Sequence, residues 1–119
     1  MSKCVAISVC RKNGIDSALD HRFGRAPAFV IIDLDSRKVI CEFDNESINQ
    51  VQGAGTGAAA RIAKEGVDGV ISGRFGPKAY EALKQLGIEM WVAPDTITAA
   101  EAITRLESGE LEHMEVKVY

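Results

Sequence analysis

The second half of the chain alternates short, β-branched apolar runs with segments of helical periodicity. Residues 67–72 and 88–92 have the length and composition of buried strands. Helical segments precede the first of these strands, separate the two, and follow the second. Strands that are joined through a helix normally pair in parallel with a right-handed crossover. This alternation predicts an α/β fold built on a parallel sheet.

Each predicted helix carries its own start or stop signal. The glycine-rich run 53–57 enters an alanine-rich helix, for which Gly66 is the expected C-cap. Pro77 suits the first position of the second helix. Thr98 and Glu101 have the spacing of a capping box at the start of the third helix.

The first half predicts three strands and one long loop. Strands are expected at residues 3–10, 28–34 and 37–43, and the turn at 35–36 joins the last two as a hairpin. Residues 11–27 form the loop. The expected order of elements is therefore βββαβαβα.

Length and composition limit the class of protein. A chain of 119 residues with 46% hydrophobic content fits a single domain over residues 1–119 with an ordinary core. Residues 110–119 are expected either to add an edge strand or to form a mobile tail. The formal charge of −3 argues against a nucleic-acid partner, which needs a basic surface.

Membrane and secretion signals are not expected either. The apolar run near the N-terminus is too short to span a membrane and has no signal-peptide pattern, so a cytoplasmic location is expected. The three cysteines are an odd number without a CxxC pair, which does not make a disulfide framework.

Several loops are expected to meet at one edge of the sheet. If the strands at 3–10, 67–72 and 88–92 are parallel, their carboxyl ends share an edge, where open α/β sheets bind ligands. The connections that leave this edge lead into helix N-termini, which offer free N–H groups and partial positive charge to an anion. The cations on or beside these connections are Arg22, Arg25, Arg74 and Lys78. The topology therefore predicts an anion-binding site.

The individual motifs at this edge each have two interpretations. The run 53–57 lacks the spacing of a dinucleotide fingerprint or a Walker A loop, so it is either an anion-facing helix entry or a closely packed helix start. The arginines that flank Phe23 and Gly24 either clamp an anion or belong to a surface turn anchored by Phe23. Cys10 at a strand end and the loop residue His21 are candidate metal ligands, for which an ordinary structural role is the alternative.

Catalytic constellations are not apparent in the sequence. The hydroxyl residues Ser8, Thr56 and Ser72 have no evident base partner, which a nucleophilic mechanism requires. The first strand carries no carboxylate of the kind that two-metal chemistry needs. We therefore expect a binding protein and not an enzyme.

The chain resembles the dinitrogenase iron–molybdenum cofactor biosynthesis family over nearly its whole length. The resemblance rests on residues 20–29, on the glycine-rich run 53–57 with its helix, on 66–73, 76–79 and 86–88, and on 102–111. It implies a three-layer α/β/α, ribonuclease-H-like fold with a mixed five-stranded sheet in the order 3-2-1-4-5. It also implies a protein that binds or carries iron–sulfur or molybdenum-containing clusters.

Two positions depart from the family pattern. Arg22 stands where family members with a His-Phe-Gly turn have the suspected cluster-contacting histidine, and Val51-Gln52 stand where a second histidine is often found. An arginine does not ligate iron in this role, but it can pair with an anionic cluster or its organic acid. Cys10 and His21 are then the remaining ligand candidates.

The resemblance and the residues together give one expected function and one alternative. The first is a non-catalytic binding or carrier protein for an anionic iron–sulfur or iron–molybdenum-type cluster in metallocofactor assembly. Its expected partners are cluster donor or acceptor proteins, without nucleic acid or membrane, and the chain is expected as a monomer or weak homodimer. The alternative is a metal-free binding or regulatory module for a small phosphorylated or carboxylated metabolite. The expected cofactor-binding residues are Arg22, Phe23, Gly24, Arg25, Gly53, Gly55, Thr56, Gly57, Gly73, Arg74 and Gly76.

Overall fold

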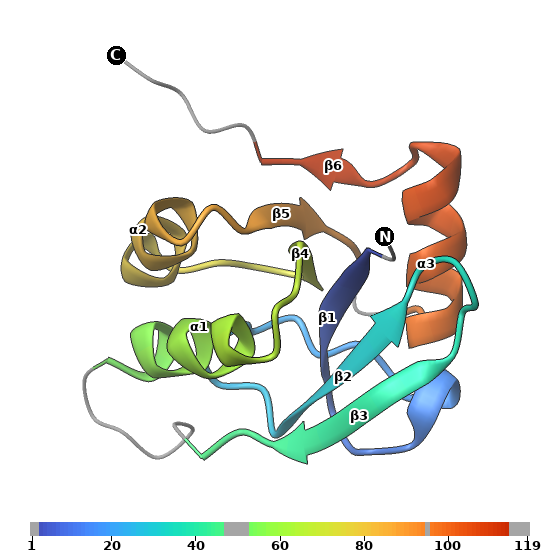
Figure 1. Cartoon of the computed structure of the whole chain (residues 1–119), viewed down its shortest axis with the longest axis horizontal. Helices are drawn as coiled ribbons and strands as arrows, with labels where there is room; N and C mark the ends of the chain where they lie inside the picture. The colour runs from blue at the N-terminus through green and yellow to red at the C-terminus, as the bar shows by residue number, and fades with distance from the viewer. Residues whose placement is uncertain (1–2, 47–52, 95, 115–119) are drawn as a thin grey trace.

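A computed structural model describes residues 3–46, 53–94 and 96–114. Figure 1 shows one twisted sheet between two groups of helices. The first half contains β1 (Cys4–Val9), the short 3-10 helix η1 (Gly14–Asp16), β2 (Ala28–Asp33) and β3 (Val39–Asp44). The second half contains α1 (Ala54–Lys64), β4 (Gly69–Ser72), α2 (Pro77–Gln85), β5 (Glu89–Val92), α3 (Ala99–Ser108) and β6 (Glu112–His113).

The sheet is mixed and has the strand order β3-β2-β1-β4-β5-β6. Strands β1, β4 and β5 are parallel to one another. Strand β2 pairs antiparallel with both β1 and β3, which gives the meander. The parallel pairing follows from the helical crossovers α1 and α2, as the alternation in the sequence predicts.

The prediction of a five-stranded sheet is wrong, because the sheet has a sixth strand. Residues 110–119 were expected to form either an edge strand or a mobile tail, and within them β6 pairs antiparallel with β5 and satisfies backbone groups at an otherwise open sheet edge. The imidazole ring of His113 also packs against Trp91, with the ring centroids 5.3 Å apart. Residues 115–119 lie outside the described residues. The ribonuclease-H-like relationship stays a prediction.

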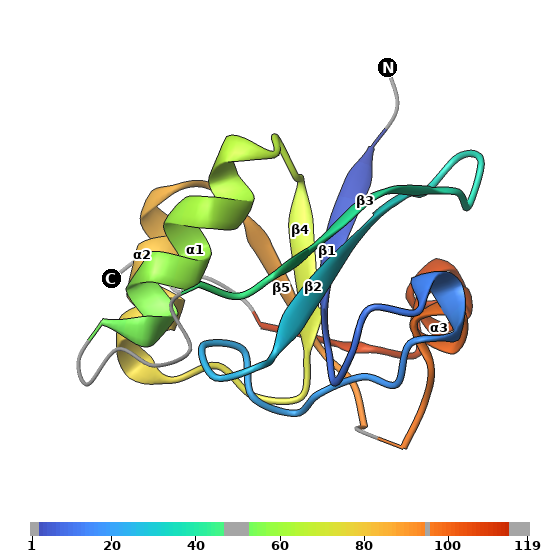
Figure 2. The ribbon, with the colours of Figure 1, turned by 90° about the horizontal axis from the view of Figure 1, so that it is seen from below.

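The sheet has helices on both of its faces (Figure 2), and a separate hydrophobic cluster lies on each side of it. Alternate residues of β1 serve them: Val5 and Ile7 pack on the side of α3, and Ala6 packs on the side of α1 and α2. The structure therefore has three layers, with α1 and α2 on one face and α3 on the other. No helix in the described ranges is both long and apolar enough to cross a membrane.

Small residues allow α1 to approach α2 closely. The buried face of α1 includes Ala58 and Ala59, and α1 begins at Ala54, so part of the glycine-rich run lies within its first turn. A Cβ added at Gly55 would lie 2.8 Å from the Cβ of Ala79 in α2, a separation that real Cβ atoms do not show. The spacing between the two helices therefore depends on glycine at position 55.

We expect the substitution Gly55→Val to lower the free energy of unfolding by about 1–3 kcal/mol, because the added side chain must push α2 away. Gly76→Val is the matched control: Gly76 has φ −71° and ψ 164°, which valine adopts readily, and an added Cβ would meet no heavy atom within 4 Å. Urea unfolding of both variants measures the difference. Equal losses in the two variants would contradict the close-packing explanation.

Candidate anion-binding site

Three connections meet at the carboxyl edge of β1 and β4, which is the lower edge of the sheet in Figure 2. A Cβ added at Gly24 would lie 2.8 Å from the Cα of Gly55, so the loop before β2 touches the start of α1. The Phe23 N–H donates to the Arg74 carbonyl at 3.1 Å, which ties the same loop to the connection before α2. Residues far apart in the sequence are thus held side by side by their backbones.

These connections surround a hollow of about 550 Å³. Four cationic side chains line it, those of Arg22, Arg25, Arg74 and Lys78, and none of the described residues that line it is acidic. The other lining residues are His21, Phe23, Gly24, Gly53, Ala54, Gly55, Gly76, Pro77 and Ala79. The formal charge of the whole chain is −3, so positive charge is concentrated at this hollow.

Two helices begin at the wall of the hollow. Gly53, with φ 82°, is the N-cap of α1, and Gly76 is the N-cap of α2; neither cap supplies a side-chain hydrogen bond. In contrast, the N-cap Thr98 of α3 accepts a hydrogen bond from the Glu101 N–H. The helix ends at the hollow therefore present N–H groups and partial positive charge without a capping side chain.

The loop that carries Arg22 and Arg25 is anchored by the residues between and beside them. Phe23 is 1% exposed, and its ring centroid lies 5.5 Å from that of Phe29 and 5.4 Å from that of Phe75. The side-chain amide of Asn45 donates to the carbonyls of Gly24 and Ala26 at 3.0 and 2.9 Å. The two interpretations of this turn are therefore compatible, since Phe23 packs in the core while the arginines line the hollow.

The cationic side chains differ in their partners. Arg22 lies beside the carboxylate of Asp20, with Nε–Oδ1 and Nη2–Oδ2 distances of 3.4 Å each. Arg74 and Lys78 are exposed and form no ion pair with the part of the chain that the structure describes. Their charges are therefore not neutralised by a neighbouring carboxylate among those residues.

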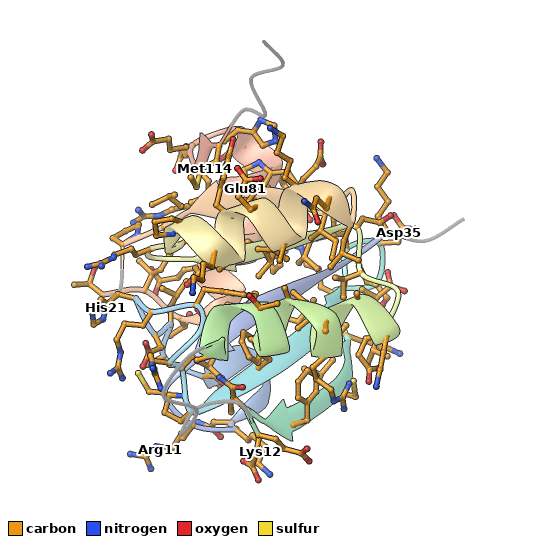
Figure 3. The ribbon with its side chains drawn as sticks, turned by 90° about the vertical axis from the view of Figure 1, so that its left-hand side faces the viewer. Arg11, Lys12, His21, Asp35, Glu81 and Met114 are labelled. Atoms are coloured by element: carbon orange, nitrogen blue, oxygen red, sulfur yellow. The ribbon has the colours of Figure 1, made fainter. Side chains whose placement is uncertain are left out.

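The two candidate metal ligands lie at the margin of the site. His21 lines the hollow and projects outward at the edge of the molecule (Figure 3). Cys10 is exposed but does not line the hollow; its Sγ lies 3.8 Å from both the Leu19 carbonyl and Asp20 Oδ2. Across the described ranges, no group of three or more His, Cys, Asp or Glu side chains is arranged to hold a metal ion.

The other two cysteines lie near the far end of α1. Burial, followed by the nearby Asp68 carboxylate, raises the pKa of the Cys4 thiol, and burial with the nearby Glu65 carboxylate raises that of Cys41. The hydrogen bond from Arg61 holds the pKa of Glu65 below its usual value. Because metal binding and nucleophilic attack use the thiolate, Cys4 and Cys41 are poor candidates for either role at neutral pH.

The structure brings together most of the predicted binding residues but not all. Thr56 and Gly57 do not line the hollow, because α1 starts at Ala54 and its turn carries them past the opening. Gly73 instead packs against His21, where an added Cβ would lie 2.6 Å from the histidine Cα. Val51 and Gln52 lie outside the described residues.

One contribution to the site was predicted in part and another was missed. Lys78 was predicted as a cation beside these loops but not as a cofactor-binding residue, and it lines the hollow from the first turn of α2. Asp20 was not predicted, although the spacing Asp20-His21-Arg22 fits its turn, in which Asp20 Oδ1 accepts the Arg22 N–H at 2.8 Å.

Known proteins match the chain along most of its length. The family described as dinitrogenase iron-molybdenum cofactor matches residues 3–109. An uncharacterized protein of Methanocaldococcus jannaschii is 34% identical over 102 residues, which cover 84% of this chain and 86% of that protein.

Solved structures share the fold. The apo form of the orange protein from Desulfovibrio gigas has a TM-score of 0.89 and 30% identity, covering 96% of this chain and 94% of that one. A putative NifB protein from Thermotoga has a TM-score of 0.81 and 29% identity, covering 100% and 98%. The resemblance inferred from the sequence is confirmed, and the chain belongs to the dinitrogenase iron-molybdenum cofactor family.

Proposed function

We propose that this protein is a non-catalytic binding or carrier protein for an anionic iron–sulfur or iron–molybdenum-type cluster in metallocofactor assembly. The observation that carries the proposal is the hollow of about 550 Å³, which is lined by four cationic side chains and two helix N-termini and, within the described ranges, by no acidic residue. Such a surface attracts and holds an anion.

The lining suits a cluster that keeps its own ligands. Guanidinium and backbone N–H groups donate hydrogen bonds to sulfide, oxo or carboxylate acceptors on an anion, and they do not coordinate its metal ions. Among the residues that line the hollow, His21 is the side chain able to coordinate a metal. We therefore propose that ion pairing and hydrogen bonding supply most of the affinity, with His21 as the candidate for direct coordination.

The relatives agree with a cofactor-related role. The family description links this chain to the dinitrogenase iron-molybdenum cofactor, and one structural relative is a putative NifB protein. Another is described as an apo form, a term for a protein studied without its bound group. Cluster donor or acceptor proteins are the proposed partners. The expectations of a cytoplasmic location and of a monomer or weak homodimer stay predictions.

A metal-free role is the second candidate function. Arginines and helix N-termini recognise phosphate and carboxylate groups as readily as they recognise a cluster. The observation that favours this role is that no metal-ligating group of three side chains occurs in the described part of the chain. The ligand would then be a small phosphorylated or carboxylated metabolite.

Anaerobic reconstitution with iron and sulfide, or incubation with tetrathiomolybdate, is expected to give a protein that retains metal through gel filtration and shows a visible absorption band. Elemental analysis and the absorption spectrum measure this. A colourless, metal-free protein would contradict the cluster proposal. Stabilisation by a metabolite would then support the second candidate, since a ligand at a hundred times its Kd adds about 2.7 kcal/mol.

The double substitution Arg25→Gln, Arg74→Gln is expected to weaken tetrathiomolybdate binding about tenfold or more, because it removes two charges that line the hollow. Lys38→Gln, Lys64→Gln is the matched control: it makes the same change in formal charge, but neither lysine lines the hollow. Equilibrium titration compares the two, with thermal unfolding as the test of folding. If both double variants bound tetrathiomolybdate equally weakly, the loss would come from the net charge of the protein, which would contradict binding at the hollow.

A further inference from the structure

A buried carboxylate lies directly behind the cationic wall. Asp20 is 6% exposed and does not line the hollow itself. Its backbone N–H donates to the Ser8 carbonyl at 2.8 Å, and the Ser8 hydroxyl lies 2.8 Å from the Asp20 carbonyl. The same Ser8 Oγ lies 2.7 Å from the Ser72 hydroxyl oxygen. Asp20 is therefore fixed to the ends of both β1 and β4.

This fixed carboxylate faces one particular cation of the site. Asp20 Oδ1 accepts the Arg22 N–H at 2.8 Å, and both carboxylate oxygens lie 3.4 Å from nitrogens of the Arg22 guanidinium. The Asp20 side chain is 7% exposed, whereas that of Arg22 is 51% exposed. Asp20 is thus buried and held by hydrogen bonds, whereas Arg22 reaches the hollow from a solvated position.

We propose that Asp20 is a resident counter-anion that competes with the bound ligand for Arg22 and so lowers the affinity of the site. The inference rests on the proposed function, since it concerns the same hollow and the same anionic ligand. An anion that approaches Arg22 meets the negative charge of Asp20 directly behind it. Removal of that charge therefore strengthens binding.

Asp20 also orients Arg22, and this contribution has the opposite sign. The 3.4 Å contacts are longer than the 2.7–2.9 Å typical of strong charge-assisted hydrogen bonds, and half of the arginine side chain is exposed to water. The pair therefore orders the guanidinium only weakly. The charge of Asp20 acts from a buried position, where salt screens it less. The electrostatic effect is expected to outweigh the loss of orientation.

A counter-anion of this kind suits a protein that must release its cargo. Differences in affinity among variants of one site appear mainly in the dissociation rate. The Asp20 carboxylate weakens the attraction between Arg22 and the bound anion. It therefore shortens the lifetime of the complex and makes transfer of the anion to an acceptor easier. Asp20 then affects the ligand through its charge beside Arg22 and without touching the ligand itself.

The test is the substitution Asp20→Asn, measured by titration with tetrathiomolybdate and with inorganic phosphate. Asparagine keeps an oxygen that accepts the Arg22 N–H, so the turn is retained. We expect binding roughly three- to tenfold tighter, as the removal of one nearby buried charge implies. The gain should lie mainly in a slower dissociation rate. It should disappear in the Arg22→Gln background.

Asp33→Asn is a matched control. Asp33 Oδ1 accepts the Asp35 N–H at 2.8 Å in the same kind of turn, but Asp33 ends β2 at the opposite edge of the sheet. This variant makes the same change in charge and is expected to leave binding unchanged. Thermal unfolding of each variant measures any effect on stability separately.

The outcomes separate this inference from the proposed function. Wild-type protein that binds neither probe contradicts the proposed function and this inference with it. Wild-type protein that binds, together with an Asp20→Asn variant that binds equally or more weakly, contradicts the inference alone. An equal gain in the Arg22→Gln background, or in Asp33→Asn, shows a general charge effect and also overturns it.

Discussion

Backbone segments approach one another at the carboxyl edge of the sheet with no side chain between them, and the hollow depends on these approaches. Added Cβ atoms at Gly24 and Gly55 would lie 2.8 Å from Gly55 and Ala79, respectively, and one at Gly73 would lie 2.6 Å from His21. Each distance is shorter than packed atoms accept, so only glycine fits. Through these contacts the loop before β2, the start of α1 and the start of α2 hold one another in place. The glycines therefore determine how closely the segments around the hollow approach one another.

The charge distribution follows from this packing. Because the three segments are close, Arg22, Arg25, Arg74 and Lys78 share one surface with the N-termini of α1 and α2. Like charges repel, so an anion that bridges them gains both direct attraction and relief of that repulsion. The carboxylate of Asp20 beneath Arg22 offsets part of this attraction. The buried Asp20 carboxylate would then lower the affinity for the anion enough to permit its release.

Membership of the family agrees with the fold, whereas the proposed mode of binding is argued from the residues of this site. The family match over residues 3–109 agrees with the fold, whereas this chain has Arg22 where the resemblance leads us to expect a histidine. An arginine donates hydrogen bonds and does not coordinate a metal ion, so it would hold a cluster in a different way. The proposed binding by ion pairing follows from this chain's own residues, and the relatives supply the class of ligand.

The sequence by itself determined the order of the five main strands and three α-helices, the parallel central strands and the edge at which the glycine loops meet, because hydrophobic periodicity is a local property of the chain and crossovers follow a general rule of handedness. It also indicated Arg22, Arg25 and Arg74. The sequence left residues 110–119 as either an edge strand or a mobile tail, and only the tertiary structure decided for the sixth strand, because Glu112 and His113 pair with the open edge of β5. The same holds for the orientation of Thr56 and Gly57 past the hollow, and for Asp20 behind Arg22. These depend on the exact helix start and on contacts between distant segments, which local patterns do not encode.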